Sequence, residues 1–539
     1  MEAIIEKTGL SPLTLVVAGT LFVTFLLIQI TPKPESKGGK KGVQYPNGPS
    51  PFPLFGNIFS FAALKQRPDR ELLNIARKYG QICMLWFGSN PVIIISSPKL
   101  AKELMDKRGS IYSSRPEQNP FRATVMPWRL VTTPAGETFR LLRKIYHNLL
   151  GPKSAVTFRK YQNFESKVFL TTLLDSPSGF LMDVERFAMS VIFSAVYGVR
   201  LDELDHPAMK EFYSLWEVML KYFQPGSLLL DFFPALQHLP KFMQPKLKLA
   251  SNLRTQEIKL HRAFLETLKK QVREGCAPQC FGSLLVQIQE DENIDDEKAC
   301  DILAMLIGAG ADTTSSYLQS FFKVMALHPK VMQKAHEELD RVVGPKRLPV
   351  WEDEMNLPYV RALIKEVHRW APIGSLGIPH ATSKSDVVDG RTIPNGTIVF
   401  PNLTALSRDS DRYQDPDTFE PERFLGDDLD ASSSAVHPDY MKRDHFHYGF
   451  GRRLCQGIFV AEASLYIVVS RVLWGFDITP MKGAKPLDMD AKMAGLVTKP
   501  KPYKVSITSR GPQFEKVIRQ SRLDAKTDIL NFDDVVFAQ

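Results

Sequence analysis

One cysteine lies in a short run whose composition suits a metal ligand. Cys455 is preceded by Gly451 and Arg453 and followed by Gly457, and the apolar run from Ile458 predicts the start of a helix. A helix N-terminus and nearby arginines lower the pKa of a thiol, and the thiolate is the form that binds metals. Glycines let backbone N–H groups approach the sulfur and let a flat, bulky cofactor approach the backbone. A buried structural cysteine is the alternative, but these offsets favour a liganding thiolate.

A second chemically suited group lies within the helical pattern at 294–327. The run "GAGADTTSS" places Ala309, Gly310 and Thr313 on one helical face, with Asp312 beside them. Two glycines inside a helix cost about 1 kcal/mol each relative to alanine, so a compensating role is expected. That role is either a tight helix crossing or a groove in which a cofactor lies close to the backbone, beside an acid and an alcohol.

The run around the cysteine resembles the haem-binding loop of the cytochrome P-450 family. The family's pattern is aromatic-x-x-Gly-x-Arg-x-Cys-x-Gly, and the matching residues are Tyr448, Gly451, Arg453, Cys455 and Gly457. The resemblance implies haem b as the cofactor, with Cys455 as the axial ligand of its iron. The family usually has phenylalanine where Tyr448 stands, so the tyrosine hydroxyl needs a partner.

The helical motif is similar to the family's oxygen-activation signature, Ala/Gly-Gly-x-Asp/Glu-Thr-Thr/Ser. The resemblance implies that Asp312 and Thr313 are catalytic and that Ala309 and Gly310 lie against the haem. This match favours the groove over the tight helix crossing.

Three weaker motifs follow the same family order. "KEVHR" carries Glu366 and Arg369, which are three residues apart on one predicted helix. "FEPERF" carries Arg423, and the resemblance implies that these three residues form a structural triad that stabilises the haem-side core.

Two residues are expected to contact the haem propionates by the same resemblance. Arg143 lies in "ETFRLLRK" and His380 in "GIPHAT". Phe139 stands where the family has tryptophan, so an indole N–H contact would be lost.

The resemblance spans residues 45–509 and implies a mainly α protein with a small β region, in the cytochrome P-450 fold. Sulfur ligation favours O–O cleavage, so the expected reaction inserts one atom of O2 into an apolar organic substrate. Members of the microsomal type receive electrons from NADPH through a separate NADPH-cytochrome P-450 reductase. Motifs such as "GIPHAT" look like those of filamentous-fungal members, which often act on secondary metabolites of the polyketide, terpenoid or indole-alkaloid type.

Two alternative functions stay open. One is a rearranging or dehydrating enzyme that keeps the thiolate haem, although the Asp312-Thr313 pair argues against it. The other is a non-catalytic, membrane-tethered haem or lipid-binding protein. NADPH consumption in the presence of reductase and substrate would separate that protein from an enzyme.

The bulk composition of the 539 residues is that of a globular protein, with 44% hydrophobic and 24% charged residues. The net charge of +9 is mild for this length and does not indicate nucleic-acid binding. It suits an acidic protein partner or an anionic membrane surface. The five cysteines form an odd and sparse set, which argues against a disulfide framework and implies a domain that faces the cytosol.

The N-terminal segment departs from that of a soluble protein. No charged residue lies between Thr8 and Pro32, and about 20 apolar residues suffice to span a bilayer. A cleaved signal peptide is the alternative, but residues 1–7 lack a basic start and no clear cleavage site follows. Lysines at 33–41 place the rest of the chain in the cytoplasm. We expect a single transmembrane anchor in the endoplasmic reticulum membrane at 1–32.

The rest of the chain is expected to divide into three parts. They are a basic and proline-rich hinge at 33–57, a haem-thiolate catalytic domain at 58–509 and a C-terminal tail of unknown role at 510–539. Within the catalytic domain, helical spacing predicts helices at 68–80, 160–198, 206–223, 245–274, 294–327, 330–343, 357–370 and 458–475. Strands are predicted at 90–98 and 503–509 and as a pair around a turn at 391–402, and a surface loop at 430–435.

Two segments are candidates for ligand contact. The proline-broken apolar run at 225–243 reads as buried core or as a mobile lid that dips into lipid. The irregular stretch at 109–135 is expected to cover a pocket. Other pocket-lining candidates are 119–128, 302–313, 373–377 and 493–497.

Overall fold

The computed structural model describes residues 44–529 with gaps at 53–54, 58–59, 61–67, 89, 204, 224–233, 239, 241–243, 491 and 494–496. The expected anchor at 1–32, the first part of the hinge and most of the apolar segment at 225–243 lie outside these described residues.

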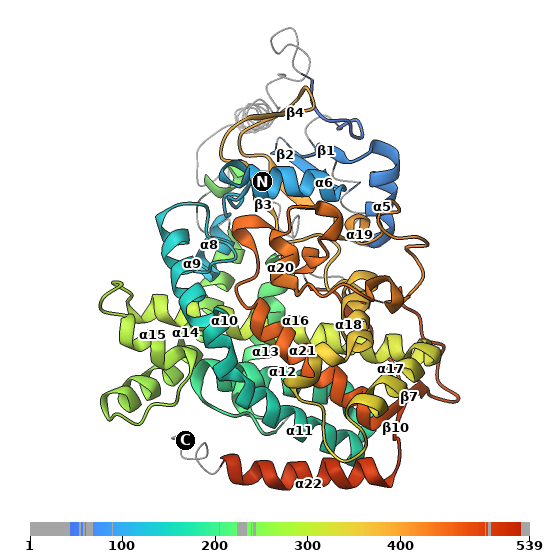
Figure 1. The fold of residues 1–539 in the computed structure, drawn as a ribbon. Coiled ribbons are helices and arrows are strands. Elements are labelled where there is room, and N and C mark those ends of the chain that lie inside the picture. The colour runs from blue at the N-terminus through green and yellow to red at the C-terminus, as the bar shows by residue number, and fades with distance from the viewer. Residues whose placement is uncertain are drawn as a thin grey trace, which may run out of the picture.

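Helices make up most of the molecule, and the largest sheet lies at one end of it (Figure 1). The helices are α5 (Pro68–Tyr79), α6 (Pro98–Ala101), α7 (Gly109–Tyr112), α8 (Pro120–Val125), α9 (Glu137–Leu150), α10 (Pro152–Ala155), α11 (Arg159–Asp175), α12 (Phe180–Tyr197), α13 (Pro207–Phe223), α14 (Pro245–Arg273), α15 (Phe281–Ile288), α16 (Asp296–Leu327), α17 (Pro329–Val342), α18 (Pro358–Trp370), α19 (Leu403–Leu406), α20 (Ala431–Val436), α21 (Ile458–Gly475) and α22 (Pro512–Ile529). The mainly α prediction is confirmed.

The ends of α16 follow from local chemistry. The Asp295 side chain accepts the Lys298 backbone N–H at 2.8 Å, which caps the first turn. The helix ends at Leu327, two residues before Pro329, because proline disfavours helical conformation in the residue before it. The prediction of a helix at 294–327 is therefore confirmed to within two residues.

Two predictions of secondary structure were wrong. The pattern at 160–198 forms two helices, α11 and α12, separated by a short 3-10 turn at Pro177–Gly179, because proline removes a helical hydrogen bond. The segment at 430–435 is not a surface loop. Asp430 accepts the Ser433 N–H and starts the short helix α20, whose Ser434 is fully buried.

Within the described residues, ten strands form one sheet of four strands and three pairs. The larger sheet has the order β1 (Ile82–Phe87), β2 (Asn90–Ile95), β6 (Ile398–Pro401), β3 (His380–Ala381). The pairs are β4 (Asp386–Val388) with β5 (Arg391–Ile393), β7 (Phe476–Pro480) with β10 (Val505–Ser509), and β8 (Lys492–Met493) with β9 (Lys499–Pro500).

The two strands predicted at 391–402 exist as β5 and β6, but they belong to different sheets. β5 pairs with β4 across Asp389 and Gly390, whose positive φ values of 49° and 74° suit the tight turn of a hairpin. β6 instead lies parallel to β2 and antiparallel to β3, which places His380 beside Val399.

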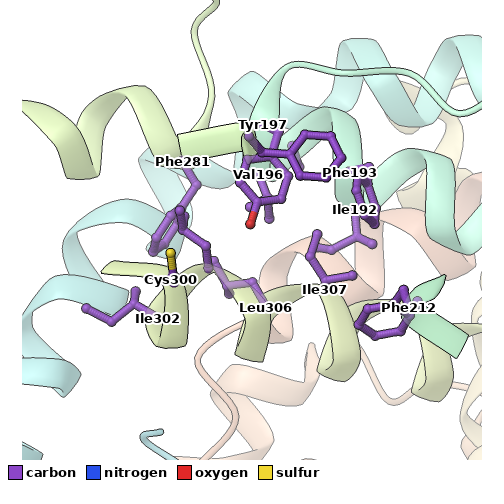
Figure 2. Close-up of a cluster of buried hydrophobic side chains, with 14 of the residues drawn as sticks. Ile192, Phe193, Val196, Tyr197, Phe212, Phe281, Cys300, Ile302, Leu306 and Ile307 are labelled. Carbon is purple, nitrogen blue, oxygen red and sulfur yellow. The ribbon is translucent and has the colours of Figure 1, made fainter. Parts of the chain in front are cut away.

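The core is built around α16, which packs against α12 (Figure 2). Ile192 of α12 faces this helix, and a Cβ atom on Gly310 would lie 2.7 Å from its Cδ1 atom. A Cβ atom on Gly308 would lie 2.4 Å from the Trp216 ring of α13. Both glycines of the "GAGADTTSS" run therefore allow close helix packing, which was one of the two expected roles.

Helix α21 follows the cysteine loop and crosses the interior. In the described part of the chain it is the one helix long and apolar enough to span a bilayer, and most of it is buried within the protein. Beyond β10, the C-terminal segment forms α22, which packs against α11 at the lower edge of Figure 1. Among its residues 512–525, Phe514, Ile518 and Ala525 are buried.

Candidate active site

The cysteine loop and the middle of α16 share the wall of a cavity of about 810 Å³. Most of the predicted site residues line this cavity, namely Arg143, Ala309, Gly310, Thr313, His380, Arg453, Cys455 and Gly457. Gly451 and Asp312 do not line it. The expected lining segments 119–128, 302–313 and 373–377 all contribute, as does Val497.

Backbone geometry holds the cysteine loop in place. The Cys455 N–H donates to the Tyr448 carbonyl at 2.8 Å, and the Cys455 side chain is accessible from the cavity. Gly449 and Gly451 have φ values of 87° and 50°, a region that favours glycine. A Cβ atom on Gly451 would lie 2.3 Å from the Met105 carbonyl oxygen, so this glycine serves close packing of the loop.

The side chains of Asp312 and Thr313 on α16 point in different directions. Thr313 lines the cavity, and its hydroxyl donates to the Ala309 carbonyl at 2.6 Å. Asp312 is buried, lies outside the cavity wall and pairs with Lys499 of β9 at 2.7 Å. The prediction that Asp312 and Thr313 lie together in a groove was wrong, because successive helical residues point about 100° apart and a buried carboxylate needs a partner.

Arg453 reaches away from the sulfur toward an irregular segment. Its guanidinium donates to the carbonyls of Ser113, Leu130 and Thr133 at 2.7, 3.0 and 2.8 Å. It also lies 3.6 Å from the centre of the Phe139 ring. The phenylalanine that replaces the family's tryptophan thus stacks on the arginine of the cysteine loop.

Two more arginines lie beside Arg453. Arg115 donates to the carbonyls of Ile378 and Pro379 at 3.0 and 2.7 Å, and Arg143 donates to the Arg452 carbonyl. Burial lowers the pKa of all three arginines, that of Arg453 to about 9, with Arg143 adding repulsion. None of the three has a carboxylate partner among the described residues. The cavity wall therefore carries a positive charge that nothing described neutralises.

His380 lies next to this positive charge. Its Nδ1 atom is 2.8 Å from the Tyr112 carbonyl, so this nitrogen carries the proton. Burial, with Arg115 and Arg453 nearby, lowers the pKa of His380 well below its ordinary value. The ring is therefore neutral.

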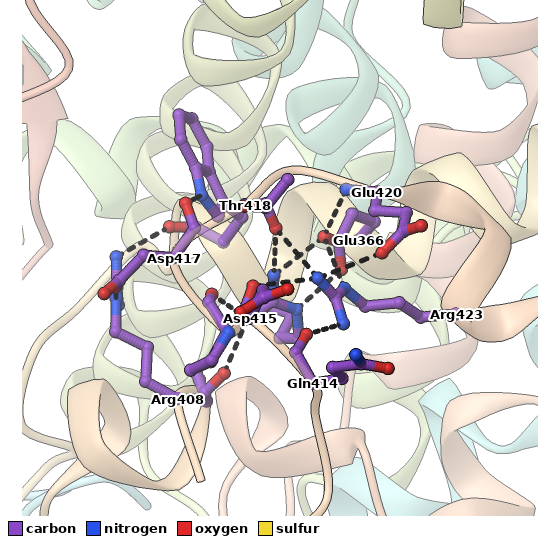
Figure 3. Close-up of polar contacts among 12 residues, drawn as sticks. Glu366, Arg408, Gln414, Asp415, Asp417, Thr418, Glu420 and Arg423 are labelled. Carbon is purple, nitrogen blue, oxygen red and sulfur yellow. Dashed lines mark hydrogen bonds and ion pairs between the residues drawn. The ribbon is translucent and has the colours of Figure 1, made fainter. Parts of the chain in front are cut away.

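The predicted triad residues meet where α18 packs against the segment at 414–423 (Figure 3). Arg369 holds Glu366 through two parallel bonds of 2.6 and 2.7 Å. Arg423 lies 3.6 Å from the same carboxylate and also binds the Asp415 carbonyl at 2.9 Å. This arrangement fixes α18 to the segment at 414–423.

Comparison with known proteins identifies the family. The model of the cytochrome P-450 family matches residues 46–507. The chain belongs to the cytochrome P-450 family. It is 72% identical over 92% of its length to cytochrome P-450 monooxygenase polD of Polytolypa hystricis, of which it covers 96%. It is 34% identical to cytochrome P-450 monooxygenase virE of Hypocrea virens and 33% identical to fogE of Aspergillus ruber, over 90% and 88% of the chain and 89% of each relative. The chain is thus a monooxygenase of this family.

Family membership implies a haem whose iron is bound by a cysteine thiolate, and the residues of this cytochrome P-450 fit that group. Haem carries two carboxylates, and the unpaired arginines 115, 143 and 453 supply the charge to receive them. The Cys455 sulfur opens into the same cavity. The arginines would bind the haem carboxylates, the Cys455 thiol would bind the iron, and the apolar cavity wall would contact the flat ring.

The surroundings of Cys455 differ from the expectation in one respect. Burial raises the pKa of the thiol, while the Gly457 backbone N–H acts in the opposite direction. The flanking arginines, which were expected to lower this pKa, are not among its causes. The Arg453 guanidinium is directed toward the carbonyls of another segment and not toward the sulfur. The iron of the cytochrome P-450 haem would itself keep the sulfur deprotonated.

Two residues of the site were missed in the sequence. Arg115 is an arginine in an irregular segment, and no spacing rule distinguishes it from a surface residue. Lys499 reaches Asp312 only through the pairing of β9 with β8 and the packing of β9 on α16.

The Tyr448 hydroxyl, expected to need a partner, is buried and has none among the described residues.

Proposed function

We propose that this cytochrome P-450 inserts one atom of O2 into an apolar secondary metabolite of the polyketide, terpenoid or indole-alkaloid type. The single observation that carries this proposal is the cavity that joins the Cys455 thiol to an apolar wall. That wall includes Ile192, Trp216, Leu306, Ile373, Leu376 and Val497. An apolar wall of this kind favours a substrate with few charged groups.

Cys455 would hold the iron, and Arg115, Arg143 and Arg453 would hold the haem carboxylates. Bound in this way, the haem would supply an iron at which O2 is activated and the O–O bond is cleaved. The apolar wall excludes bulk water and positions the substrate.

Thr313 is the candidate proton donor on the cavity wall. Its Oγ1 proton is held by the Ala309 carbonyl, so the hydroxyl must exchange that acceptor before it can donate into the cavity. A proton lost from Oγ1 has to be replaced from solvent. The pair formed by Asp312 and Lys499 continues to Glu185 at 3.4 Å, and the Glu185 side chain is 29% exposed. This polar chain would connect the region behind Thr313 to the surface.

Electrons would come from NADPH through a separate NADPH-cytochrome P-450 reductase. The uncharged run at 8–32 and the lysines at 33–41 support a single-pass anchor in the endoplasmic reticulum membrane, with the catalytic domain in the cytoplasm. Membrane lipid and an apolar small molecule would then be the other partners, and the chain offers no reason to expect nucleic acid.

The substrate would be found by comparing the metabolites of a fungal host with and without the expressed chain. With that substrate, Thr313→Ala should lower product formation by about 100- to 10,000-fold while NADPH is still oxidised, because an acid–base group is lost. The measurement is product formed per NADPH consumed. Thr314→Ala is the control, since Thr314 also lines the cavity. An unchanged ratio for Thr313→Ala would favour the rearranging enzyme, and no NADPH consumption by the wild type would favour the non-catalytic haem protein.

A further inference from the structure

We propose that Arg129 determines which ligands the cavity accepts, by fixing one wall of the cavity from behind. Arg129 belongs to the segment 126–133, which forms no regular helix or strand. Met126, Leu130, Val131 and Thr132 line the cavity, whereas Arg129 does not. The proposal rests on the proposed function in one respect, namely that the substrate occupies this cavity.

The Arg129 side chain is completely buried and points into the packing between α14 and α16. Its Nη2 atom lies 2.5 Å from Glu257 of α14, and its Nε atom lies 3.5 Å from Asp301 of α16. Arg254 of α14 pairs with the same Asp301 at 2.5 Å. Two arginines and two carboxylates thus form a neutral buried network that ties the wall segment to two long helices.

The Arg129 backbone holds the rest of the segment. Its carbonyl accepts the N–H groups of Thr132 and Thr133 at 3.0 and 2.9 Å and the Thr133 hydroxyl at 2.7 Å. From the other side, Arg453 of the cysteine loop donates to the carbonyls of Leu130 and Thr133. The wall is therefore held at two places, by Arg129 from the helices and by Arg453 from the haem side.

A stabilising role alone does not account for a buried network of this kind. Removing two charges from water is costly, and apolar residues of similar volume often give equal or greater stability. What the ion pairs add is a fixed position, because a buried guanidinium that moves away from its carboxylates is left as an uncompensated charge. An irregular segment lacks the repeating backbone bonds that would fix it otherwise. Arg129 is therefore a positioning residue, and the position that it sets is the shape of the wall.

The first test compares two charge-balanced double variants of the haem-loaded protein. Arg129→Leu with Glu257→Leu removes the anchor of the wall. Arg254→Leu with Asp301→Leu removes the other pair and the longer contact of Arg129 with Asp301, but keeps the contact of Arg129 with Glu257. The probes are imidazole and 4-phenylimidazole, small and bulky nitrogen ligands of haem, titrated by absorbance. The ratio of their dissociation constants should change by about tenfold or more in the first variant, the effect of a misfit of one methylene group. It should change by less in the second variant, which keeps the shorter contact of Arg129 with Glu257.

An unchanged ratio in the first variant would overturn the role of Arg129, and equal changes in both variants would do the same. A wild type that binds neither probe and lacks the reduced carbon monoxide spectrum would instead overturn the proposed function. Hydrogen–deuterium exchange of the wild type tests the anchor without any variant. The amides of Thr132 and Thr133 should exchange as slowly as those of α16, and fast exchange at both would contradict the proposal.

Discussion

Two clusters of buried and half-buried arginines in this protein differ in their partners. Arg369 and Arg423 share the carboxylate of Glu366 and bind several backbone carbonyls. Arg115, Arg143 and Arg453 bind carbonyls only, and no described carboxylate neutralises them. The first cluster is complete within the protein, whereas the second carries charge that a ligand must balance.

The partners of an arginine therefore indicate whether it is structural or binds a ligand in this fold. A carbonyl satisfies an N–H group but does not cancel a full charge, so a buried arginine with carbonyls alone remains costly. That cost is visible in the lowered pKa values of the three unpaired arginines. Since arginine stays charged in proteins, this cost is relieved only by an anion such as a haem propionate.

The largest effect is expected when the completed cluster is broken. Glu366→Gln leaves Arg369 buried without a carboxylate and Arg423 with Glu420 alone, which should lower the free energy of unfolding by about 3–5 kcal/mol. Urea denaturation of the haem-loaded protein measures it. Glu137→Gln is the control, because its pair with Arg140 is exposed and contributes less than about 1 kcal/mol. Equal losses of unfolding free energy in both variants would mean that the buried ion pairs stabilise the protein no more than an exposed pair does.

Removing an arginine from the cluster formed by Arg115, Arg143 and Arg453 should have opposite effects in the two states. It should not destabilise the haem-free protein, but it should weaken the binding of haem. Arg115→Met removes an unpaired buried charge, so the haem-free protein should keep its melting temperature or gain a few degrees. Haem should dissociate about 10- to 100-fold faster, because a hydrogen bond to a charged group contributes about 1.5–3 kcal/mol. Transfer of haem to excess apomyoglobin measures the rate, with exposed Arg140→Met as the control. A variant that is destabilised without haem and retains it normally would assign Arg115 to structure alone.

A third prediction, with a smaller expected effect, concerns a carboxylate without a cation partner, in contrast to the arginines without a carboxylate. Glu462 of α21 has no ion-pair partner among the described residues, and burial raises its pKa from 4.5 to about 8. The folded protein then holds a proton that the unfolded chain has lost, so the free energy of unfolding falls as pH rises from about 4.5 through about 8. Glu462→Gln should flatten this slope by at most about 1.4 kcal/mol per pH unit. Parallel curves for wild type and variant would show that Glu462 is ionised in the fold.

The sequence was sufficient for the features that depend on local pattern. The cysteine loop, the helix that carries Thr313 and the pairing of Glu366 with Arg369 each follow from spacing within a few residues. Features that depend on packing between distant segments were not accessible. Examples are the pairing of Asp312 with Lys499, the direction of the Arg453 side chain and the separation of β5 from β6. In each case the deciding partner lies far away in the chain.

The placement of α22 shows the same limit. Its residues have helical spacing, but nothing in them indicates the surface on which they pack. Arg519 pairs with Asp175 at 2.8 Å, and the Arg522 guanidinium lies 4.7 Å from the Phe164 ring. Both partners belong to α11, so only the tertiary structure shows what the C-terminal helix covers.

The central claim is that Cys455 and the unpaired arginines form one site for a thiolate-bound haem. The most direct test is the carbon monoxide difference spectrum of the reduced protein, recorded for the wild type and for Cys455→Ser. The wild type should give the thiolate-type spectrum, and the variant should lose it even where some haem remains bound. A variant that keeps the thiolate-type spectrum would show that another residue holds the iron, and would contradict the account.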